Sequence, residues 1–307
     1  MDVSIIIPTL NNENTIGRAI MSLLNQKTNL SFEIVIIVNY KGEKTLEICK
    51  QYESEYDSIK VLVTKEFTAK ARQEAVDYSH GDYLMFLDGD DYYHENMIEH
   101  MYHLIKDSEA DIAQCAYYYV RDKGTKPTKL AKNKVLNQAE AIKSLMKDIY
   151  VHGFMWNKIY KASLMRNANI TYPNELMVRE DVLLNFKLFL KINKFVMSKE
   201  PLYYYDKTGG GITSSINKRR IEWFLIIMAL ERHFIEESKK EELLKAFRQV
   251  KLYRKFLILG DELINKKGYT KEEYKALKKV DRKLLKIINS KDPLPLENMP
   301  WSNYLKL

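Results

Sequence analysis

The 307-residue sequence has few of the features that mark secreted, membrane-spanning or disordered proteins. Its two cysteines, Cys49 and Cys115, lie far apart and form neither a disulfide framework nor a metal-type spacing. The longest apolar run, residues 223–230, is too short to cross a bilayer. The start has no charged segment followed by an apolar one, so we expect no signal peptide and a cytoplasmic protein. Ordinary proportions of hydrophobic and charged residues, 46% and 29%, indicate a globular chain.

An excess of basic residues is confined to the last third of the chain. Residues 217–307 hold 22 Lys and Arg against 13 Asp and Glu, whereas the first 216 residues are close to neutral. Contact with anionic lipid at the inner face of the membrane and contact with a second copy of the chain would both use such a surface. A solvated helical face rich in Lys is weighed equally. The segment 221–234 carries more apolar residues than one buried stripe needs, and packing against the rest of the chain is its alternative.

Apolar runs alternate with helical segments over the first half of the chain. Residues 3–8, 32–38, 59–64 and 82–88 are predicted strands, and the segments between them have apolar residues at helical spacing. This alternation predicts an α/β class: a mostly parallel central sheet flanked by helices. Residues 111–120 are a further predicted strand, and the lysine-rich segment 124–134 is predicted to be a loop. We expect a first domain, residues 1–216, and a helical C-terminal extension, residues 217–307, with helices at 217–237, 239–265 and 270–289.

One predicted strand stops abruptly at three carboxylates, Asp88, Asp90 and Asp91. Ligands of parallel sheets bind at the carboxyl ends of the strands, and like charges crowded there call for a cation. Asp88 and Asp90 are two residues apart, so both can approach one Mg²⁺ or Mn²⁺ whose remaining ligands are water and diphosphate oxygens. The alternatives are an acidic turn without a ligand and a phosphatase-type nucleophile, although the latter expects its Asp pair after the first strand of the core.

Other segments allow a functional and a structural interpretation. The pair Glu180 and Asp181 is either a charge pair favoured by the dipole of the following helix or includes a general base. The aromatic ring of Trp156 and the neighbouring Lys158 belong either to the core or to a phosphate or sugar contact. The glycine run after Tyr205 is either a linker or a loop that closes over a ligand.

Taken together, the first 216 residues resemble the inverting family-2 glycosyltransferases of bacteria, which have the Rossmann-like GT-A fold and build capsule, teichoic-acid or adhesin glycans. The likeness rests on many motifs in the same order. They are SIIIPTLNNENTIGRAIMSLLNQ (4–26), AKARQEAVDYSHGDYLMFLDGDD (69–91), WNKIY (156–160), REDVLLNFKL (179–188) and LYYYDKTGGGITSS (202–215).

The resemblance implies a metal-dependent transfer from a nucleotide diphospho-sugar, with a UDP-sugar as the expected donor, to a hydroxyl of a glycan, lipid-linked or protein-linked acceptor. It implies that Asp90 and Asp88 hold Mn²⁺ or Mg²⁺, that Asp91 supports the site, and that Asp181 is the catalytic base, oriented by Glu180. It places further residues at the donor: Pro8, Thr9, Leu10, Asn11, Asn39, Arg72 and Gly89. At the acceptor, or in the loop that closes over the diphosphate, it places Trp156, Lys158, Tyr205 and Ser214.

The chain departs from the family pattern where the base is read. The family commonly has Tyr at the position of Leu10, Asp-Asp-Gly-Ser at residues 38–41, and Arg at the position of Asp206. The alternative hypothesis is therefore a glycosyltransferase-like binding or scaffold module with impaired catalysis. Neither interpretation includes a nucleic acid as partner.

Overall fold

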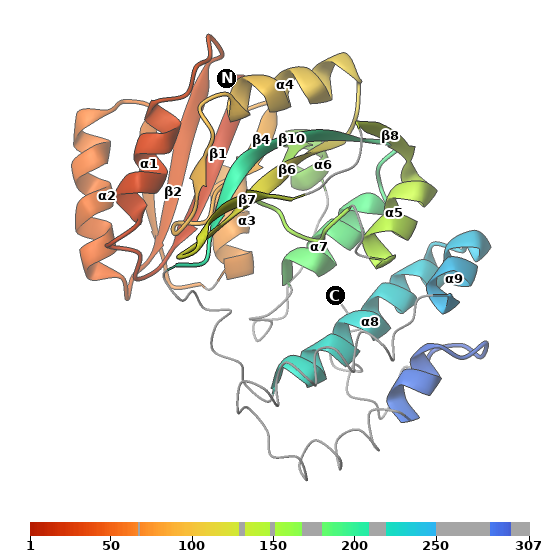
Figure 1. The fold of residues 1–307 in the computed structure, drawn as a ribbon. Coiled ribbons are helices and arrows are strands. Elements are labelled where there is room, and N and C mark those ends of the chain that lie inside the picture. The colour runs from red at the N-terminus through yellow and green to blue at the C-terminus, as the bar shows by residue number, and fades with distance from the viewer. Residues whose placement is uncertain are drawn as a thin grey trace. The chain divides into compact units, whose positions relative to one another are not determined.

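The computed structural model describes residues 1–66, 68–128, 133–147, 151–167, 180–208, 219–249 and 283–295 (Figure 1). The chain forms two compact units. The first comprises Met1–Gln138, Phe154–Asn169 and Lys191–Gly211, and the second comprises Ala139–Gly153, Ile170–Leu190 and Ile212–Leu307. The domain boundary expected at residue 216 lies outside the described residues, so the two-domain division stays a prediction.

A ten-stranded sheet forms the centre of the first unit. Four neighbouring strands run parallel in the order β3 (Ile59–Thr64), β2 (Phe32–Asn39), β1 (Val3–Thr9) and β4 (Tyr83–Phe86). The sheet continues with β9 (Lys158–Lys161), β6 (Ile112–Arg121), β10 (Lys194–Asp206) and β5 (Tyr92–Tyr93). Off this path, β7 (Gly124–Pro127) pairs with β6, and β8 (Lys134–Asn137) pairs with β10.

The predicted α/β class is confirmed, and the sheet is mixed beyond β4. Strand β9 is antiparallel to both β4 and β6, whereas β10 is parallel to β6. Strands β5 and β9 have two and four residues, too few to give an apolar run that the sequence pattern can detect. The loop expected at 124–134 begins with β7, which forms a hairpin with β6.

Helices cover the sheet of the first unit as the sequence pattern predicts. Helix α1 (Ile16–Leu24) buries the expected stripe of Ile16, Ala19, Ile20 and Leu23. Helix α2 (Glu43–Glu55) packs against β3, and α3 (Thr68–Tyr78) packs against β1 and β2. Helix α4 (Met97–Asp107) covers β6, β9 and β10, and the short α6 (Ala162–Arg166) follows β9.

The described part of the second unit is helical, with α5 (Gln138–Lys147), α7 (Glu180–Phe189), α8 (Arg219–Glu237) and α9 (Glu241–Arg248). Every side chain from Ile226 to Arg232 in α8 is buried, and the Arg232 guanidinium donates hydrogen bonds of 2.7 Å to the carbonyls of Ile287 and Ile288. This burial favours internal packing for that half of the apolar segment 221–234. The side chains of residues 221–225 lie outside the description, so contact with a second subunit or a membrane stays a prediction.

The helix predicted at 217–237 is confirmed over residues 219–237. The helix predicted at 239–265 is confirmed over 241–248, and residues 283–288 of the segment 270–289 are helical. The rest of both segments lies outside the described residues. Within the described residues, no helix combines the length and the apolar character needed to cross a membrane.

A buried carboxylate ties three elements together at the amino edge of the sheet. Glu33 of β2 accepts hydrogen bonds of 2.6 Å from the Ser4 hydroxyl and from the backbone N–H of His80. Ser4 in turn accepts one of 2.7 Å from the N–H of Gly81. A Cβ atom on Gly81 would lie 2.5 Å from the Ser4 nitrogen, so this turn requires glycine. Burial alone would raise the pKa of Glu33, but the hydrogen bonds from Ser4 and His80 lower it.

We expect Glu33→Gln to lower the free energy of unfolding by about 1–2 kcal/mol at neutral pH, because the charged acceptor of these bonds is lost. A carboxyl group whose pKa is lowered by folding stabilises the protein above its unfolded pKa, and this contribution is lost as the pH falls through the folded value. The difference between wild type and variant in urea unfolding should therefore be largest above pH 4.5, the ordinary value for this group, and shrink below it. The exposed Glu47→Gln is the control. An equal difference at both ends of this pH range would contradict the prediction.

Candidate functional site

The carboxyl ends of the parallel strands bring the predicted donor residues to one edge of the sheet. Thr9 pairs with Val38, Ile6 pairs with Phe86, and Asn39 pairs with Thr64. The segments that follow β1, β2 and β4 therefore leave the sheet at the same edge, as the sequence predicts.

The acidic loop, residues 88–91, packs closely against the segment that follows β1. The N–H of Asp91 donates to the Asp88 carbonyl at 3.0 Å and closes a turn. The Thr15 hydroxyl donates to the Gly89 carbonyl at 2.8 Å. A Cβ atom on Gly89 would lie 2.7 Å from the Thr9 hydroxyl oxygen, so glycine is required between the two carboxylates. The sequence DGD therefore has a packing reason for its central residue.

Asp91 anchors the acidic loop to β10. Its carboxylate is buried and accepts hydrogen bonds of 2.6 Å from the Tyr203 hydroxyl and 2.7 Å from the N–H of Asp206. Burial raises the pKa of Asp91 well above its ordinary value, and the charges of Asp88 and Asp90 raise it further. The contacts of Asp91 are with protein groups, which fits a supporting residue.

Arg18 of α1 joins the acidic loop to the end of β10. Its guanidinium donates to the Asp90 carbonyl at 2.6 Å, forms an ion pair of 2.7 Å with Asp206, and lies 4.5 Å from the centre of the Tyr92 ring. Burial alone would raise the pKa of Asp206, but hydrogen bonds from Thr208 and the charge of Arg18 lower it. Sequence reasoning missed Arg18, although Asp206 at a position where the family has Arg is the kind of charge reversal that calls for a nearby cation.

The predicted residue Arg72 lies beside the acidic loop. It reaches from α3 so that its Nη2 atom is 3.7 Å from a carboxylate oxygen of Asp88. The N–H of Asp88 donates to the Tyr203 hydroxyl at 3.3 Å, so Tyr203 contacts both ends of the loop. Asp90 lies partly buried, and burial raises the pKa of its carboxyl group, while the charge of Lys207 lowers it. An ionised Asp90 is thus costly in this environment without a further cation.

The residues expected at the nucleoside line the same edge. Pro8 and Thr9 end β1, Leu10 follows, and Asn11 has a φ of 54°, a left-handed conformation that Asn tolerates. The Asn39 side chain donates to the Glu66 carbonyl at 3.0 Å and accepts from the N–H of Lys41 at 3.2 Å. These bonds leave one donor hydrogen and one lone pair of the amide for a base. Contact between Asn39 and a base stays a prediction.

The predicted catalytic pair belongs to the second unit. Asp181 is half-buried in the first turn of α7 and accepts from the N–H of Val182 at 2.8 Å. Asn185 fixes α7 by donating to the Gly153 carbonyl at 2.7 Å. A Cβ atom on Gly153 would lie 2.6 Å from a methyl group of Val182. The side chain of Glu180 lies outside the description, and the roles of both acidic residues stay predictions.

The structure favours the core interpretation of Trp156 and Lys158. Trp156 is 5% exposed and stacks on Tyr203 and Tyr205, with ring centres 4.3 and 5.1 Å away. Lys158 is fully buried and donates to Asn157 at 3.0 Å and to the Phe154 carbonyl. Tyr205 is half-buried at the rim of this aromatic cluster. Ser214 lies outside the described residues.

The donor set fits a divalent cation only in part. Among the described residues, no group of three or more His, Cys, Asp or Glu side chains is arranged to hold a metal. Asp88 and Asp90 supply two carboxylates at most, because Asp91 is committed to Tyr203 and Asp206. A Mg²⁺ or Mn²⁺ ion commonly takes one or two carboxylates and completes its shell with water and phosphate oxygens, so the pair is compatible with such an ion.

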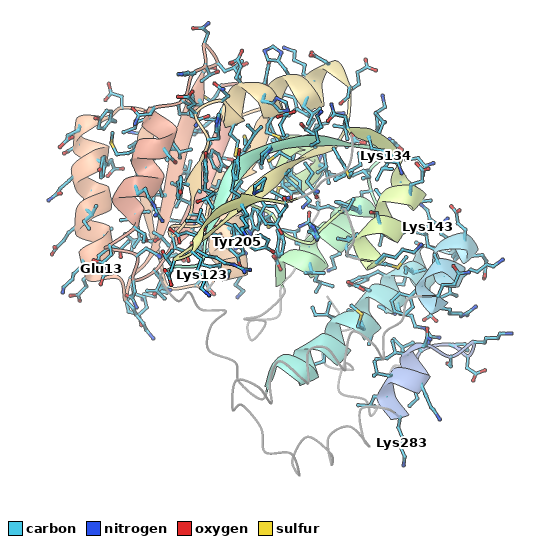
Figure 2. All side chains as sticks on the ribbon, in the orientation of Figure 1. Glu13, Lys123, Lys134, Lys143, Tyr205 and Lys283 are labelled. Atoms are coloured by element: carbon cyan, nitrogen blue, oxygen red, sulfur yellow. The ribbon has the colours of Figure 1, made fainter. Side chains whose placement is uncertain are left out.

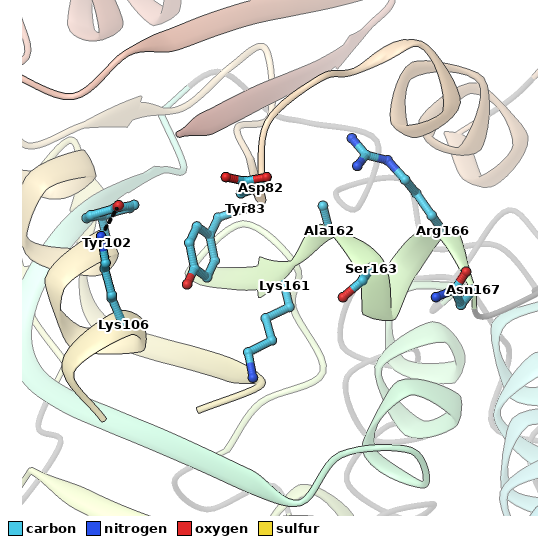
Figure 3. Close-up of a pocket in the computed structure, with 9 residues that line it drawn as sticks. All are labelled: Asp82, Tyr83, Tyr102, Lys106, Lys161, Ala162, Ser163, Arg166 and Asn167. Carbon is cyan, nitrogen blue, oxygen red and sulfur yellow. Dashed lines mark hydrogen bonds between the residues drawn. The ribbon is translucent and has the colours of Figure 1, made fainter. Parts of the chain in front are cut away.

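A cavity of about 590 Å³ lies at the start of β4, next to Asp82 and Tyr83, and so at the amino edge rather than the carboxyl edge (Figure 3). Its cations already have partners within the first unit. Lys106 donates to Tyr102 at 2.7 Å, Lys161 pairs with Asp111 at 2.9 Å, and Arg166 donates to the Ser79 carbonyl at 2.6 Å. The cavity contains none of the residues predicted at the donor or acceptor.

The fold and the acidic loop match a known enzyme family. Residues 4–184 match the model of glycosyl transferase family 2, and the chain belongs to that family. Two curated relatives are a poly(ribitol-phosphate) beta-glucosyltransferase of Bacillus spizizenii, 27% identical over 80% of this chain, and the poly(ribitol-phosphate) beta-N-acetylglucosaminyltransferase TarS of Staphylococcus aureus, 25% identical over 80%. The chain spans 39% and 44% of the length of these relatives.

A solved structure shares the fold. The crystal structure of residues 1–349 of S. aureus TarS in complex with UDP-GlcNAc aligns with a TM-score of 0.67 at 24% identity, covering 81% of this chain and 72% of that one. At this identity the likeness supports the GT-A fold predicted from the sequence.

We expect Arg18 and Asp206 to be energetically coupled, because removing the guanidinium leaves the buried Asp206 carboxylate without its charged partner. A double-mutant cycle with Arg18→Gln and Asp206→Asn, measured by urea unfolding, should give a coupling free energy of about 0.5–1.5 kcal/mol. The exposed pair Lys27 and Glu95, also 2.7 Å apart, is the matched control and should couple by less than about 0.5 kcal/mol. Equal coupling in the two pairs would show that Arg18 does not hold the loop.

We expect Gly153→Ala to destabilise the protein by about 1–3 kcal/mol, because the added methyl group must displace Val182 and thus α7. Thermal unfolding of the variant measures the loss. Gly17→Ala is the control: its added Cβ meets only the Tyr52 hydroxyl at 3.5 Å, and alanine favours the helix α1. A Gly153 variant as stable as wild type would contradict the close packing.

Proposed function

We propose that this protein is an inverting glycosyltransferase that moves a hexose or N-acetylhexosamine from a UDP-sugar to a hydroxyl group of a bacterial surface glycan. The observation that carries the proposal is the acidic loop at the carboxyl edge of β4, flanked by Arg72 and fixed by Arg18, in a chain of glycosyl transferase family 2. The titles and names of two relatives, which mention UDP-GlcNAc and the transfer of glucose or N-acetylglucosamine, support the choice of donor.

In this proposal Asp90 and Asp88 hold Mn²⁺ or Mg²⁺ together with the donor. When bound, such an ion offsets the negative charge of the departing diphosphate. Because the protein supplies two carboxylates at most, we expect the ion to bind tightly only when the donor is present. Arg18 and Tyr203 act through the loop, since their contacts fix the backbone that carries both carboxylates.

Asp181 is the proposed general base. It takes the proton of the acceptor hydroxyl while that oxygen forms a bond to the anomeric carbon and the bond from this carbon to the diphosphate oxygen breaks. Attack from the face opposite to the leaving group inverts the configuration. The position of Asp181 in the first turn of α7, where the helix dipole favours a carboxylate, keeps the group ionised and ready to accept a proton.

A second candidate is a binding or scaffold module that has lost catalysis. The observation that favours it lies at Asn39, where the family commonly has Asp and where the amide is engaged with Glu66 and Lys41. Such a module would bind an acceptor glycan without turning over any donor.

We expect Asp181→Asn to lower the rate of sugar transfer by about 10²–10⁴-fold, because general-base catalysis is removed, and to leave the donor Kd unchanged. Transfer is measured with UDP-glucose and UDP-GlcNAc in the presence of Mn²⁺, and donor binding by calorimetry. The exposed Asp107→Asn is the control and should keep wild-type turnover. Near-complete turnover in Asp181→Asn would remove this residue from the mechanism. Absence of turnover in the wild type with every UDP-sugar would favour the scaffold alternative.

A further inference from the structure

The end of the sheet beside the acidic loop carries cations that rest on tyrosine rings. In the register of the sheet, Tyr119 of β6 lies between Tyr205 of β10 and Lys126 of β7, so these three side chains share one face. Arg121 and Lys207 follow two residues after the two tyrosines, on the same face. The chain of β10 continues in register to Lys207, whose N–H donates to the Val120 carbonyl at 2.9 Å.

The tyrosine rings hold two of these cations in place. The Arg121 guanidinium lies 5.1 Å from the centre of the Tyr119 ring, and the Lys207 ammonium lies 4.1 Å from that of Tyr205. Both distances are those of cation–π contacts, which orient the cation while its outer N–H groups stay available. Below them, Tyr205 stacks on the buried Trp156, so the surface has a rigid aromatic base.

The charges of this surface are largely uncompensated. Arg121, Lys123, Lys126 and Lys207 are all exposed. Within the part of the chain that the structure describes, Arg121, Lys123 and Lys126 form no ion pair with a carboxylate. Asp122 is the one acidic residue in the hairpin of β6 and β7. Neighbouring strands are about 4.8 Å apart, so cations on three strands extend over about 10 Å, more than a single phosphate or carboxylate group spans.

The cations border the proposed donor site. The residue before Lys207, Asp206, donates its N–H to Asp91 of the acidic loop at 2.7 Å. Figure 2 shows Lys123 and Tyr205 at the same end of the sheet as Glu13, which follows β1 at the carboxyl edge. A polymer that lies along the hairpin would therefore lead towards the acidic loop.

We propose that this surface, the cationic patch formed by Tyr119, Arg121, Lys123, Lys126, Tyr205 and Lys207, binds the acceptor, and that the acceptor is an anionic glycopolymer with phosphate or carboxylate groups along its chain. The inference rests on the proposed function, because it describes the second substrate of the same reaction. Repeated anions match several separated cations, and electrostatic complementarity of this kind sets partner choice and association rate.

Protection of an exposed sheet edge is the other use of lysines in such a position. It accounts for Lys126 on the edge strand β7. It does not account for Arg121 and Lys207, which belong to β6 and to the end of β10 and are seated on tyrosine rings.

The test compares the triple variant Arg121→Gln, Lys123→Gln and Lys126→Gln with a control triple variant, Lys44→Gln, Lys60→Gln and Lys134→Gln, which removes the same charge from exposed positions on α2, β3 and β8. Fluorescence anisotropy measures binding of labelled poly(ribitol phosphate), hyaluronan and neutral dextran at low and high salt. Removal of a surface charge that contacts an anion weakens binding by about 1.5–5-fold, so we expect the patch variant to lose about 10–50-fold.

The control variant should stay within about twofold of wild type, dextran should not bind, and the donor Kd should be the same in all three proteins. Tighter binding of poly(ribitol phosphate) than of hyaluronan identifies phosphate as the anion, and the reverse identifies a carboxylate. Wild-type affinity in the patch variant, or equal binding of dextran, would overturn the inference.

The two proposals can fail separately. If no UDP-sugar supports transfer while polymer binding depends on the patch, the proposed reaction is wrong and the anionic ligand stands. If the wild type and the patch variant transfer sugar equally well to a neutral glycan, the reaction stands and the anionic acceptor is wrong.

Discussion

Crowding of carboxylates at the end of β4 is the constraint on which this structure depends. Asp88, Asp90 and Asp91 follow a buried strand, and Asp206 of β10 lies against the same loop. Each carboxylate raises the cost of ionising its neighbours, so the loop is stable only where other groups compensate the charge. Arg18 compensates Asp206, Arg72 lies beside Asp88, and Tyr203 donates to Asp91.

This compensation leaves Asp90 as the carboxylate whose charge is least offset within the described residues. The elements that supply the partners, α1, α3 and β10, are distant in sequence and meet only at the carboxyl edge of the sheet. The site is therefore a property of the folded sheet rather than of the DGD motif alone. The cationic patch continues from the same edge, so charges of opposite sign lie next to each other along it. A donor that brings its own cation and an acceptor that brings anions would both be accommodated there.

Long apolar runs and helical spacing were sufficient to predict β1 to β4, α1 to α3 and the edge at which their loops meet. The acidic loop and Arg72 were also predicted, because strand ends of a parallel sheet have a known location. Strands β5 and β9 are too short to leave a pattern, and β7 is a polar edge strand. Trp156 and Lys158 are buried by contacts with Tyr203 and Phe154, which no local pattern records. For the same reason, sequence reasoning missed the contact of Arg18 with Asp206.

The most direct test of the central claim is a crystal structure of the protein grown with Mn²⁺ and a UDP-sugar. The account predicts density for the diphosphate beside Asp90 and Asp88, with Arg18 still bound to Asp206. Diphosphate density in the cavity at the amino edge, near Lys161 and Arg166, would contradict it. An empty acidic loop under saturating donor and metal would contradict it equally.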